Sequence, residues 1–303
     1  MPGALDGIRI LDLSNVVSGP MAVQMLADQG ATVIKVEQPG IGDISRLSGA
    51  KRGGVSSLNS VLNRNKRSIV LDIQKPGATA VMDKLIAQCD VLVQNFRPGA
   101  TARMGIDYDA LKTKFPQLIY VSISGFGRAG PYANRRVYDP IIQAVTGFVA
   151  TQKTTGTGSP DLIKNIVCDK ATALTAAQAI TAALFARERG HGGQHVELAM
   201  MDAGLAFLWP DGMWNETFVG DDVQLMPSLA DIYRVTATAD GQITYLVVSD
   251  VEWQGMCRAL GHPDLGKDKQ FLTMPDRLAN ITELVQFIET EVGTWKSADL
   301  CAR

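Results

Sequence analysis

The chain opens with short apolar runs separated by amphipathic segments, a pattern typical of strands that alternate with helices. Buried strands are predicted at residues 8–13, 31–37, 69–73, 90–96 and 118–124. A helix over 21–28 joins the first two strands, so strand, helix and strand follow one another within thirty residues. A βαβ unit of this kind contains parallel strands. The pattern therefore predicts an α/β fold whose large domain is a Rossmann-like parallel sheet.

The connection over residues 38–62 is rich in Gly and Ser and shows neither a helical nor a strand period. Connections of this length inside compact domains usually carry function or move. We therefore expect a long functional loop between the second and third strands.

The pattern changes near residue 218. Segments 231–238 and 243–249 are predicted to pair as a hairpin, because a Gly-containing turn joins them. Helices are predicted around 252–260 and 277–291. Residues 1–218 are therefore expected to form the large Rossmann-like domain, and residues 219–303 a smaller α+β domain.

A long Ala-rich helix follows Asp169 and is predicted to end at Arg187–Gly190, before a strand over 195–200. It has almost no polar face, so we expect it to be buried, with its Ala residues allowing close backbone approach. Asp169 itself has two interpretations. It suits an N-cap, where a carboxylate accepts backbone N–H groups, and it suits a nucleophile held at a buried helix start. The helix alone does not decide between them.

Composition narrows the class of protein. Of the 303 residues, 46% are hydrophobic and 20% are charged, as in globular proteins with a substantial core. The start MPGALDGIRI lacks the regions of a signal peptide, and no uncharged run reaches transmembrane length. The four cysteines are scattered without metal-ligand spacing, so we expect reduced thiols, no bound metal and a cytoplasmic location. Cys168 has apolar neighbours and is expected to be buried and inert.

The formal net charge of −2 conceals an asymmetry. Residues 51–136 carry 14 basic and 5 acidic side chains, whereas residues 137–303 carry 12 basic and 21 acidic ones. A basic segment in an acidic chain indicates an anionic ligand. Aromatic residues are not interleaved with its charges at Arg64, Lys66, Arg67 and Lys75. Because no nucleic-acid-binding module is visible either, we expect a phosphorylated small molecule and no nucleic acid.

A standard dinucleotide site is not expected. Glu37 ends the second strand, where a Rossmann NAD site has the acid that binds ribose. The first turn reads SNVVSGP, however, and lacks the GxGxxG pattern that surrounds the pyrophosphate. Ligands still bind at the carboxyl ends of parallel strands, which predicts a ligand near Asn15–Ser18.

Several long motifs occur in a fixed order along the chain. They are GIRILDLSNVVSGPMAVQMLADQGATVIKVEQPGIGD, LNRNKRSIVLDI, DVLVQNFRPGATARMGID, YVSISGFGRAGPY, the helix starting at Asp169, and ARERGHGGQHVELAMMDA. In these motifs and their order the chain resembles the class III CoA-transferases, the CaiB/BaiF family, which includes formyl-CoA transferase, carnitine CoA-transferase and the α-methylacyl-CoA racemases. The resemblance covers essentially the whole chain. It implies a CoA-binding Rossmann-like domain over residues 1–218.

By this resemblance Asp169 is the nucleophile, and the CoA thioester is a substrate, with no cofactor. Its carboxylate would form an aspartyl-CoA thioester, from which CoA passes to a carboxylic acid. The positions that match the family's CoA contacts are Asn15, Val16, Val17, Ser18, Leu71, Lys75, Asn95, Phe96, Arg97, Arg103, Met104, Arg136 and Tyr138. Val17 stands where formyl-CoA transferase has a Gln, so formyl or oxalyl specificity is not favoured.

The racemases of the family instead move a proton beside the thioester with a paired His and Asp. Their His corresponds to Tyr138 here, and the chain's histidines are His191, His195 and His262. Glu252 matches another racemase acid, although it also suits an ordinary helix start. We therefore expect a transferase, with a racemase-like enzyme as the alternative.

The resemblance also implies the partners: an acyl-CoA, a carboxylic acid and a second copy of the chain in an interlocked homodimer, without a membrane. Family chains continue beyond the equivalent of Arg303 with a segment that returns to the large domain. The small domain is therefore expected to be incomplete here, and an inactive CoA-binding fragment is a further alternative.

Overall fold

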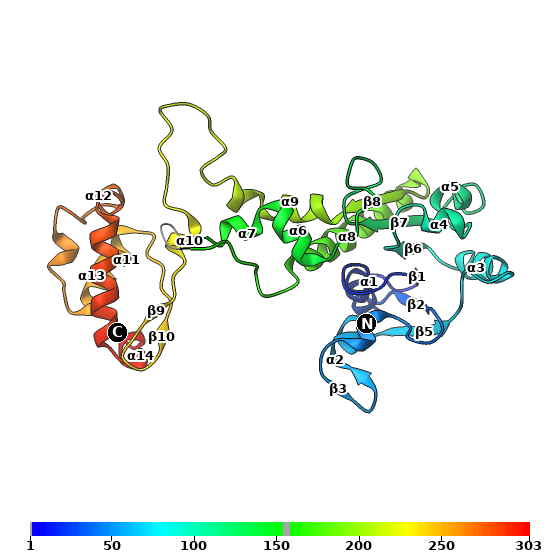
Figure 1. The fold of residues 1–303 in the computed structure, drawn as a ribbon, viewed down its shortest axis with the longest axis horizontal. Helices are drawn as coiled ribbons and strands as arrows, with labels where there is room; N and C mark the ends of the chain where they lie inside the picture. The colour runs from blue at the N-terminus through cyan, green and yellow to red at the C-terminus, as the bar shows by residue number, and fades with distance from the viewer. Residues whose placement is uncertain (1, 154–157) are drawn as a thin grey trace. The chain divides into compact units, whose positions relative to one another are not determined.

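A computed structural model describes residues 2–153 and 158–303 (Figure 1). The chain divides into two compact units. Unit 1 comprises Met1–Val149 and Leu162–Trp209, and unit 2 comprises Ala150–Asp161 and Pro210–Arg303. The two-domain division at residue 218 stays a prediction.

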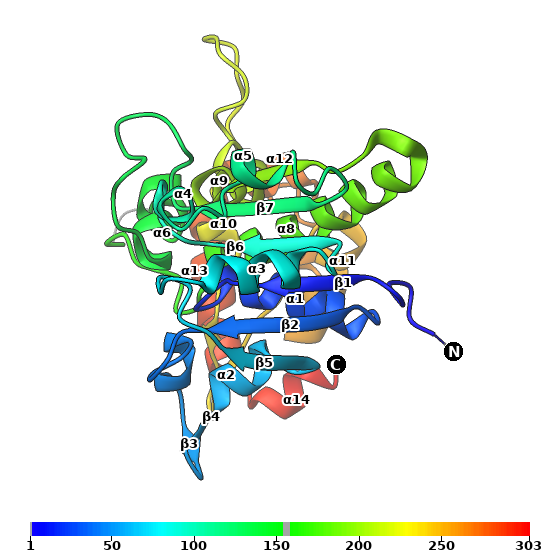
Figure 2. The same cartoon turned by 90° about the vertical axis from the view of Figure 1, so that its right-hand side faces the viewer.

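Unit 1 is built on a six-stranded sheet whose strands all pair in parallel. The strands are β1 (Arg9–Asp12), β2 (Thr32–Glu37), β5 (Lys66–Val70), β6 (Val91–Gln94), β7 (Ile119–Ser124) and β8 (His195–Ala199). They lie in the order β5-β2-β1-β6-β7-β8, and Figure 2 shows β5, β2, β1, β6 and β7 side by side. The strand order reverses between β1 and β6. The expected Rossmann-like α/β fold is confirmed, and its switch point, where such sheets bind ligands, lies at the ends of these two strands.

Helices cover both faces of this sheet. Alternate residues of a strand point to opposite faces, so Ile10 packs with α1 (Ser18–Asp28) and α8 (Val167–Ala186). Its neighbour Leu11 packs on the other face with α3 (Ala78–Ile86) and α5 (Tyr108–Leu111). The strands are therefore buried on both sides, which is why they appear as continuous apolar runs in the sequence.

Asp169 is the third residue of α8, which begins at Val167. The residue before the helix is Ile166, and no side chain caps this end. The N-cap interpretation of Asp169 is therefore wrong, because the helix starts two residues earlier than the carboxylate. The helix is also less enclosed than its apolar sequence predicts: Leu174 and Phe185 are 52% and 66% exposed.

The third strand begins three residues earlier than predicted. Lys66 pairs with Val33 in the sheet, and its amine lies inside the protein. Ion pairing with Asp12 neutralises a charge that, in the sequence, argues against a buried strand.

The segment expected to be one long loop is more ordered. It contains a 3₁₀ turn at Ile44–Leu47, a short hairpin of β3 (Lys51–Arg52) and β4 (Val55–Ser56), and α2 (Ser57–Leu62). Ser56 caps α2 by accepting the backbone N–H of Asn59. These elements are too short to produce a period in the sequence.

The rest of unit 1 contains α4 (Ala100–Arg103), α6 (Asp139–Thr146) and most of α9 (Met200–Gly212), whose last three residues belong to unit 2. Gly147 ends α6, and a separate turn, α7 (Phe148–Thr151), follows. The segment 139–151 is therefore divided into two short helices. A π-helical turn also follows α8 at Arg187–His191, where the sequence predicts the stop.

Unit 2 differs most from prediction. The hairpin consists of β9 (Thr236–Ala237) and β10 (Gln242–Ile243), each two residues long. The first part of the predicted strand 231–238 belongs to α10 (Leu229–Ile232) instead, because Ser228 caps a helix there. The remaining helices are α11 (Asp250–Leu260), α12 (Met274–Ala279), α13 (Ile281–Thr294) and α14 (Ser297–Cys301).

Glu252 belongs to the start of α11. Its carboxylate accepts the backbone N–H groups of Ser249 and Val248 at 2.8 and 2.9 Å, completing a capping box. The helix-start interpretation of Glu252 is confirmed. Among the helices of residues 2–153 and 158–303, none is both long enough and apolar enough to cross a membrane.

Candidate active site

A cavity of about 260 Å³ opens at the switch point of the sheet. It brings together residues that are far apart in the chain, namely Val16, Ser18, Asn95, Phe96, Arg97, Arg136, Tyr138 and Asp169, all of which the sequence singled out. They come from the loop after β1, the loop after β6, the segment before α6 and the start of α8. The carboxyl ends of parallel strands thus converge on Asp169, as the topology requires.

Two asparagines join the loops on either side of the switch point. Asn95 Oδ1 accepts the backbone N–H of Asn15 at 2.8 Å, and Asn95 Nδ2 donates to the Asn15 carbonyl at 2.7 Å. This reciprocal pair fixes the loop after β1 against the loop after β6. Asn15 does not line the cavity itself, but it positions residues that do.

The next residue, Val16, has a φ of +70°. A β-branched residue in this left-handed region is a genuine outlier, and such a conformation costs about 1–3 kcal/mol. Its backbone N–H donates to Asp43 Oδ1 at 3.0 Å. The strained residue is therefore held by a carboxylate from the segment after β2.

That carboxylate belongs to a buried group of charges beneath the loop. Lys35 Nζ lies 2.9 Å from Asp43 Oδ2 and donates to the Ser14 carbonyl at 2.7 Å. Asp12 pairs with Lys66 at 2.9 Å. Burial by itself would raise the pKa of Asp12, but Lys35 and Lys66 outweigh it and lower that pKa to about 2. All of these side chains support the loop from below and face away from solvent.

Part of the basic segment is therefore structural. Lys66 forms a buried ion pair with Asp12 and also donates to the Pro20 carbonyl at 2.8 Å. Arg64 forms an ion pair with Asp28. Counting charges in the segment therefore overstates the number of cations that are free for an anionic ligand, because Lys66 and Arg64 already pair with carboxylates of the protein. Sequence counting does not distinguish a paired cation from an available one.

Asp169 lines the cavity and is only 8% exposed. Burial, and then the negative charge of Asp139, raise its pKa to about 6, while hydrogen bonding from Ser18 partly opposes the rise. The group is therefore ionised above pH 6 and holds its proton more tightly than an ordinary aspartate. Its neighbour Cys168 is fully buried, as predicted, and burial raises the pKa of that thiol to about 12.

Arg97, Arg135 and Arg136 line the same cavity and are exposed. Among the described residues, none of these three forms an ion pair. The cavity thus combines one buried carboxylate with three available guanidinium groups. Guanidinium groups bind phosphates in bidentate geometry, so this site suits an anionic ligand that carries a reactive centre close to Asp169.

Arg135 and the end of β7 were missed by the sequence reasoning. Ser124 and Gly125 end this strand and line the cavity. A Cβ on Gly125 would lie 2.1 Å from Val137 Cγ1, so only Gly lets the segment before α6 approach the strand. Applying the rule of carboxyl ends to β7 as well as to β1 would have found them.

Six predicted contact residues lie outside this cavity, namely Asn15 and five others. Val17 is buried, Leu71 and Met104 pack with Phe96 against the core on the α3 side, and Lys75 and Arg103 are exposed. Their contacts with CoA stay predictions. Among the described residues, no group of three His, Cys, Asp or Glu side chains could hold a metal ion.

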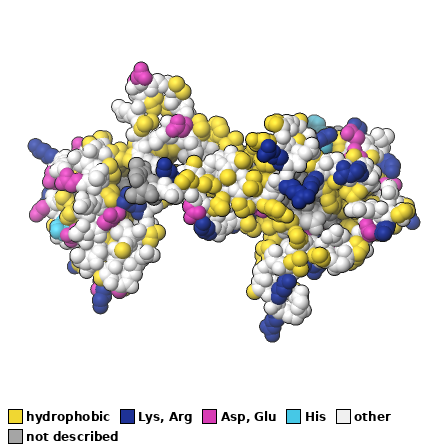
Figure 3. Space-filling model, in the orientation of Figure 1, with side chains coloured by type: hydrophobic (Ala, Val, Ile, Leu, Met, Phe, Trp, Pro, Cys, Tyr) yellow, Lys and Arg dark blue, Asp and Glu magenta, His cyan; other side chains and the backbone are white. Residues whose placement is uncertain are grey.

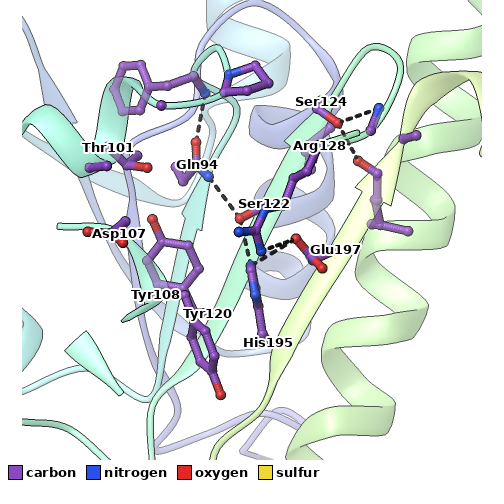
Figure 4. A pocket seen from close by; sticks show the side chains of 18 of the residues that line it. Gln94, Thr101, Asp107, Tyr108, Tyr120, Ser122, Ser124, Arg128, His195 and Glu197 are labelled. Atoms are coloured by element: carbon purple, nitrogen blue, oxygen red, sulfur yellow. Dashed lines mark hydrogen bonds and ion pairs between the residues drawn. The ribbon is translucent and has the colours of Figure 1, made fainter. Parts of the chain in front are cut away.

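A second cavity, of about 420 Å³, lies beside the first and shares Phe96 with it. Figure 4 shows its polar wall on β7 and β8. Ser122 Oγ lies 2.9 Å from His195 Nε2, and Gln94 Nε2 donates to Ser122 Oγ at 3.0 Å. Gln94 Oε1 accepts the backbone N–H of Phe96 at 2.8 Å. His195 thus has a structural place in a hydrogen-bonded chain that ends at the first cavity.

Known proteins resemble this chain along its length. The sequence model described as CoA-transferase family III matches residues 5–303. Succinate–glutarate CoA-transferase from Agrobacterium fabrum is 37% identical over 310 residues, which cover 98% of this chain and 76% of that protein. Acetyl-CoA:oxalate CoA-transferase from Acetobacter aceti is 35% identical over 307 residues, covering 98% and 77%.

Solved structures agree with the sequence comparison. A CaiB/BaiF family protein from Brucella suis has a TM-score of 0.85 at 33% identity, covering 100% of this chain and 81% of its own. A hypothetical protein from Mycobacterium tuberculosis has a TM-score of 0.87 at 31% identity, covering 99% and 81%. With the match over residues 5–303, these likenesses show that the chain belongs to CoA-transferase family III and is a CoA-transferase.

Proposed function

We propose that this enzyme moves CoA from an acyl-CoA to a carboxylic acid through an aspartyl-CoA thioester on Asp169. The observation that carries the proposal is the position of a single buried carboxylate in a cavity with three available arginines. A carboxylate with a raised pKa is a better nucleophile than an ordinary one. The arginines provide the counter-charge that a phosphorylated substrate needs.

The exchange proceeds by four acyl transfers. An Asp169 oxygen attacks the donor thioester carbonyl, and the C–S bond breaks to release CoA thiolate and leave a mixed anhydride. The thiolate then attacks the Asp169 carbonyl, which releases the donor acid as a carboxylate and forms the aspartyl-CoA thioester. The acceptor carboxylate attacks this thioester and expels the thiolate. Finally the thiolate attacks the acceptor carbonyl of the second anhydride, which frees Asp169. No proton is gained or lost overall.

The surroundings of Asp169 support this route. Ser18 is the first residue of α1, so the unpaired backbone N–H groups of a helix start lie beside the reacting carboxyl group. Such donors stabilise the oxyanion that forms at each attack. Burial of Asp169 keeps water away from the anhydrides, which hydrolysis would otherwise destroy.

Arg97 and Arg136 would bind the phosphates of CoA, with Asn95 and Phe96 beside the pantetheine. Leu71 and Met104 would hold the nucleotide end, because like Phe96 they pack against the core on the α3 side of the sheet. Lys75 and Arg103 are exposed cations that would add charge for its phosphate. The related enzymes are named for succinate and glutarate and for acetyl-CoA and oxalate. We propose small acids of this class as the first donors and acceptors to test.

We further propose a homodimer that resides in the cytoplasm. Large apolar side chains of unit 1 are exposed on three helices, at Ile141, Val145, Leu174, Leu205 and Phe207. Figure 3 shows hydrophobic side chains gathered over α6 and α9. An apolar surface of this extent is typical of a protein interface. Light scattering coupled to size exclusion measures the mass: a single-chain mass at micromolar concentration contradicts the dimer.

The decisive experiment traps the intermediate. The protein is incubated in D₂O with acetyl-CoA, succinyl-CoA or glutaryl-CoA, quenched with hydroxylamine and digested for mass spectrometry. A hydroxamate on the Asp169 peptide is expected. Asp169→Asn should lose it, whereas Asp202→Asn, which removes an exposed carboxylate outside this cavity, should keep it. Deuterium at the α-carbon of the thioester without any adduct would contradict the transferase route and favour a racemase-like reaction.

A further inference from the structure

The loop after β1 is held in a conformation that its own sequence does not favour. Val16 lies in the left-handed region at φ +70°, between Asn15 and Val17. A β-branched residue leaves this region unless its surroundings hold it there. The side chains of Val16 and Ser18 line the cavity that contains Asp169. The shape of that cavity therefore depends on whatever holds Val16.

Asp43 makes the contact that holds it. One carboxylate oxygen, Oδ1, accepts the backbone N–H of Val16 at 3.0 Å and that of Ser45 at 2.9 Å. The other oxygen, Oδ2, faces Lys35 at 2.9 Å. Asp43 is completely buried and Lys35 is 1% exposed. A water molecule from solvent therefore does not replace either partner.

Lys35 extends the same support to the preceding residue. Its amine donates to the Ser14 carbonyl at 2.7 Å and lies 3.7 Å from Asp12. The two ends of the strained turn are thus tied to one buried ion pair. Asn95 ties the residue between them, Asn15, from the opposite side. Buried ion pairs add little net stability, so a role in conformation explains this one better than a role in folding energy.

We propose that Asp43 and Lys35 are positioning residues that hold Ser14–Ser18 in the one conformation able to receive the thioester end of CoA. The inference rests on the proposed function, because it assumes that CoA binds in this cavity. Neither side chain lines the cavity, so both act through the backbone of the loop. Asp43 also caps the 3₁₀ turn Ile44–Leu47 in the segment after β2, and this turn fixes its position beneath the loop.

The test compares Asp43→Asn with a matched control, Glu37→Gln. Glu37 is a buried carboxylate of the same region that binds Arg46 and the backbone N–H of Asp43, but it does not contact the loop. Calorimetric titration with CoA is expected to show at least tenfold weaker binding for Asp43→Asn. For Glu37→Gln we expect less than a threefold change. Equal losses in the two variants would overturn the proposal.

A rescue experiment separates conformation from general damage. Gly adopts φ +70° without strain. The double variant Val16→Gly, Asp43→Asn should therefore bind CoA at least threefold more tightly than Asp43→Asn alone. No recovery would contradict a positioning role. If Asp43 merely stabilises the whole of unit 1, the double variant should not recover affinity, because Gly at position 16 would then destabilise unit 1 further.

A second readout does not require CoA. Amide hydrogen exchange of a peptide spanning residues 14–18 should be at least tenfold faster in Asp43→Asn than in Glu37→Gln. If the wild-type protein fails to bind CoA, the proposed function falls, and this exchange difference still decides the positioning role. Identical exchange in both variants would overturn it whatever CoA does.

Discussion

The backbone N–H of Asp169 donates to a carboxylate oxygen of Asp139 at 2.9 Å. Asp139 begins α6 and Asp169 lies in the first turn of α8, so two buried acids meet where two helices start. Gln143 Nε2 donates to the other oxygen of Asp139 at 2.6 Å. Asp139 therefore has its own partners, and its charge acts on Asp169 by raising the pKa of that carboxyl group. The pair thus influences the pH above which the proposed nucleophile, Asp169, is ionised.

The rate of CoA transfer should consequently fall in mild acid. The nucleophile must be ionised, and burial with the charge of Asp139 raises the pKa of Asp169 to about 6. Below that pH, kcat/KM should drop about tenfold per pH unit. Initial rates between pH 4.5 and 8 measure the profile. Asp139→Asn removes the like charge, so the midpoint should move to lower pH. A profile that stays flat down to pH 4.5 would exclude Asp169 as the group that titrates.

The same shift makes Asp169 a cost to stability at neutral pH. Its pKa is raised on folding, so its contribution is fully present below the unfolded value of 3.8 and is lost as pH rises through about 6. A shift of this size corresponds to at most about 3 kcal/mol above pH 7. Asp169→Asn should therefore raise Tm at pH 8 and leave it nearly unchanged at pH 4. Thermal unfolding at both values measures this, and equal effects at the two would contradict it.

The two kinds of cation in the basic segment should behave differently. Lys66→Met leaves Asp12 buried with one partner fewer, which costs about 3–5 kcal/mol of unfolding free energy. Arg97→Ala removes an exposed side chain that lines the cavity, so stability should change by less than about 0.5 kcal/mol. CoA affinity should fall in Arg97→Ala. Urea unfolding and calorimetric titration separate the two effects. Weak CoA binding by a fully stable Lys66→Met would show that Lys66 contacts the ligand after all.

Gly125→Ala should damage the site more than the fold. The added Cβ would lie 2.1 Å from Val137, so the segment carrying Arg136 and Tyr138 must move. We expect kcat/KM to fall at least tenfold. Gly293→Ala is the matched control, because a Cβ there meets nothing within 4 Å and lies within α13. That change should leave activity unaltered and add up to about 1 kcal/mol of stability. Unchanged activity in Gly125→Ala would show that the segment adjusts without consequence.

The periodic parts of this protein were determined by its sequence. Apolar runs such as Val91–Gln94 and Ile119–Ser124 predict buried parallel strands, because both faces of such a sheet are covered. The βαβ order then predicts where their ends converge. The motifs placed Asn95, Arg97 and Asp169 at one site, and the cavity contains all three. Local patterns and strand order suffice for these features, since each depends on neighbours in the chain or on a general rule of topology.

Only the tertiary structure decided which basic side chains form ion pairs inside the protein and which remain available for a ligand. Lys66 and Arg97 are both basic residues of the same segment of the sequence. In the structure, Lys66 forms a buried ion pair with Asp12, which lies 54 residues away, whereas no described carboxylate pairs with Arg97. Likewise, nothing local predicts φ +70° at Val16, because Asp43 imposes it from 27 residues away. Short elements such as β9 and α10 depended on a single cap or pair. Desolvation and ion pairing act through space, so their outcome is not written in any one segment of the chain.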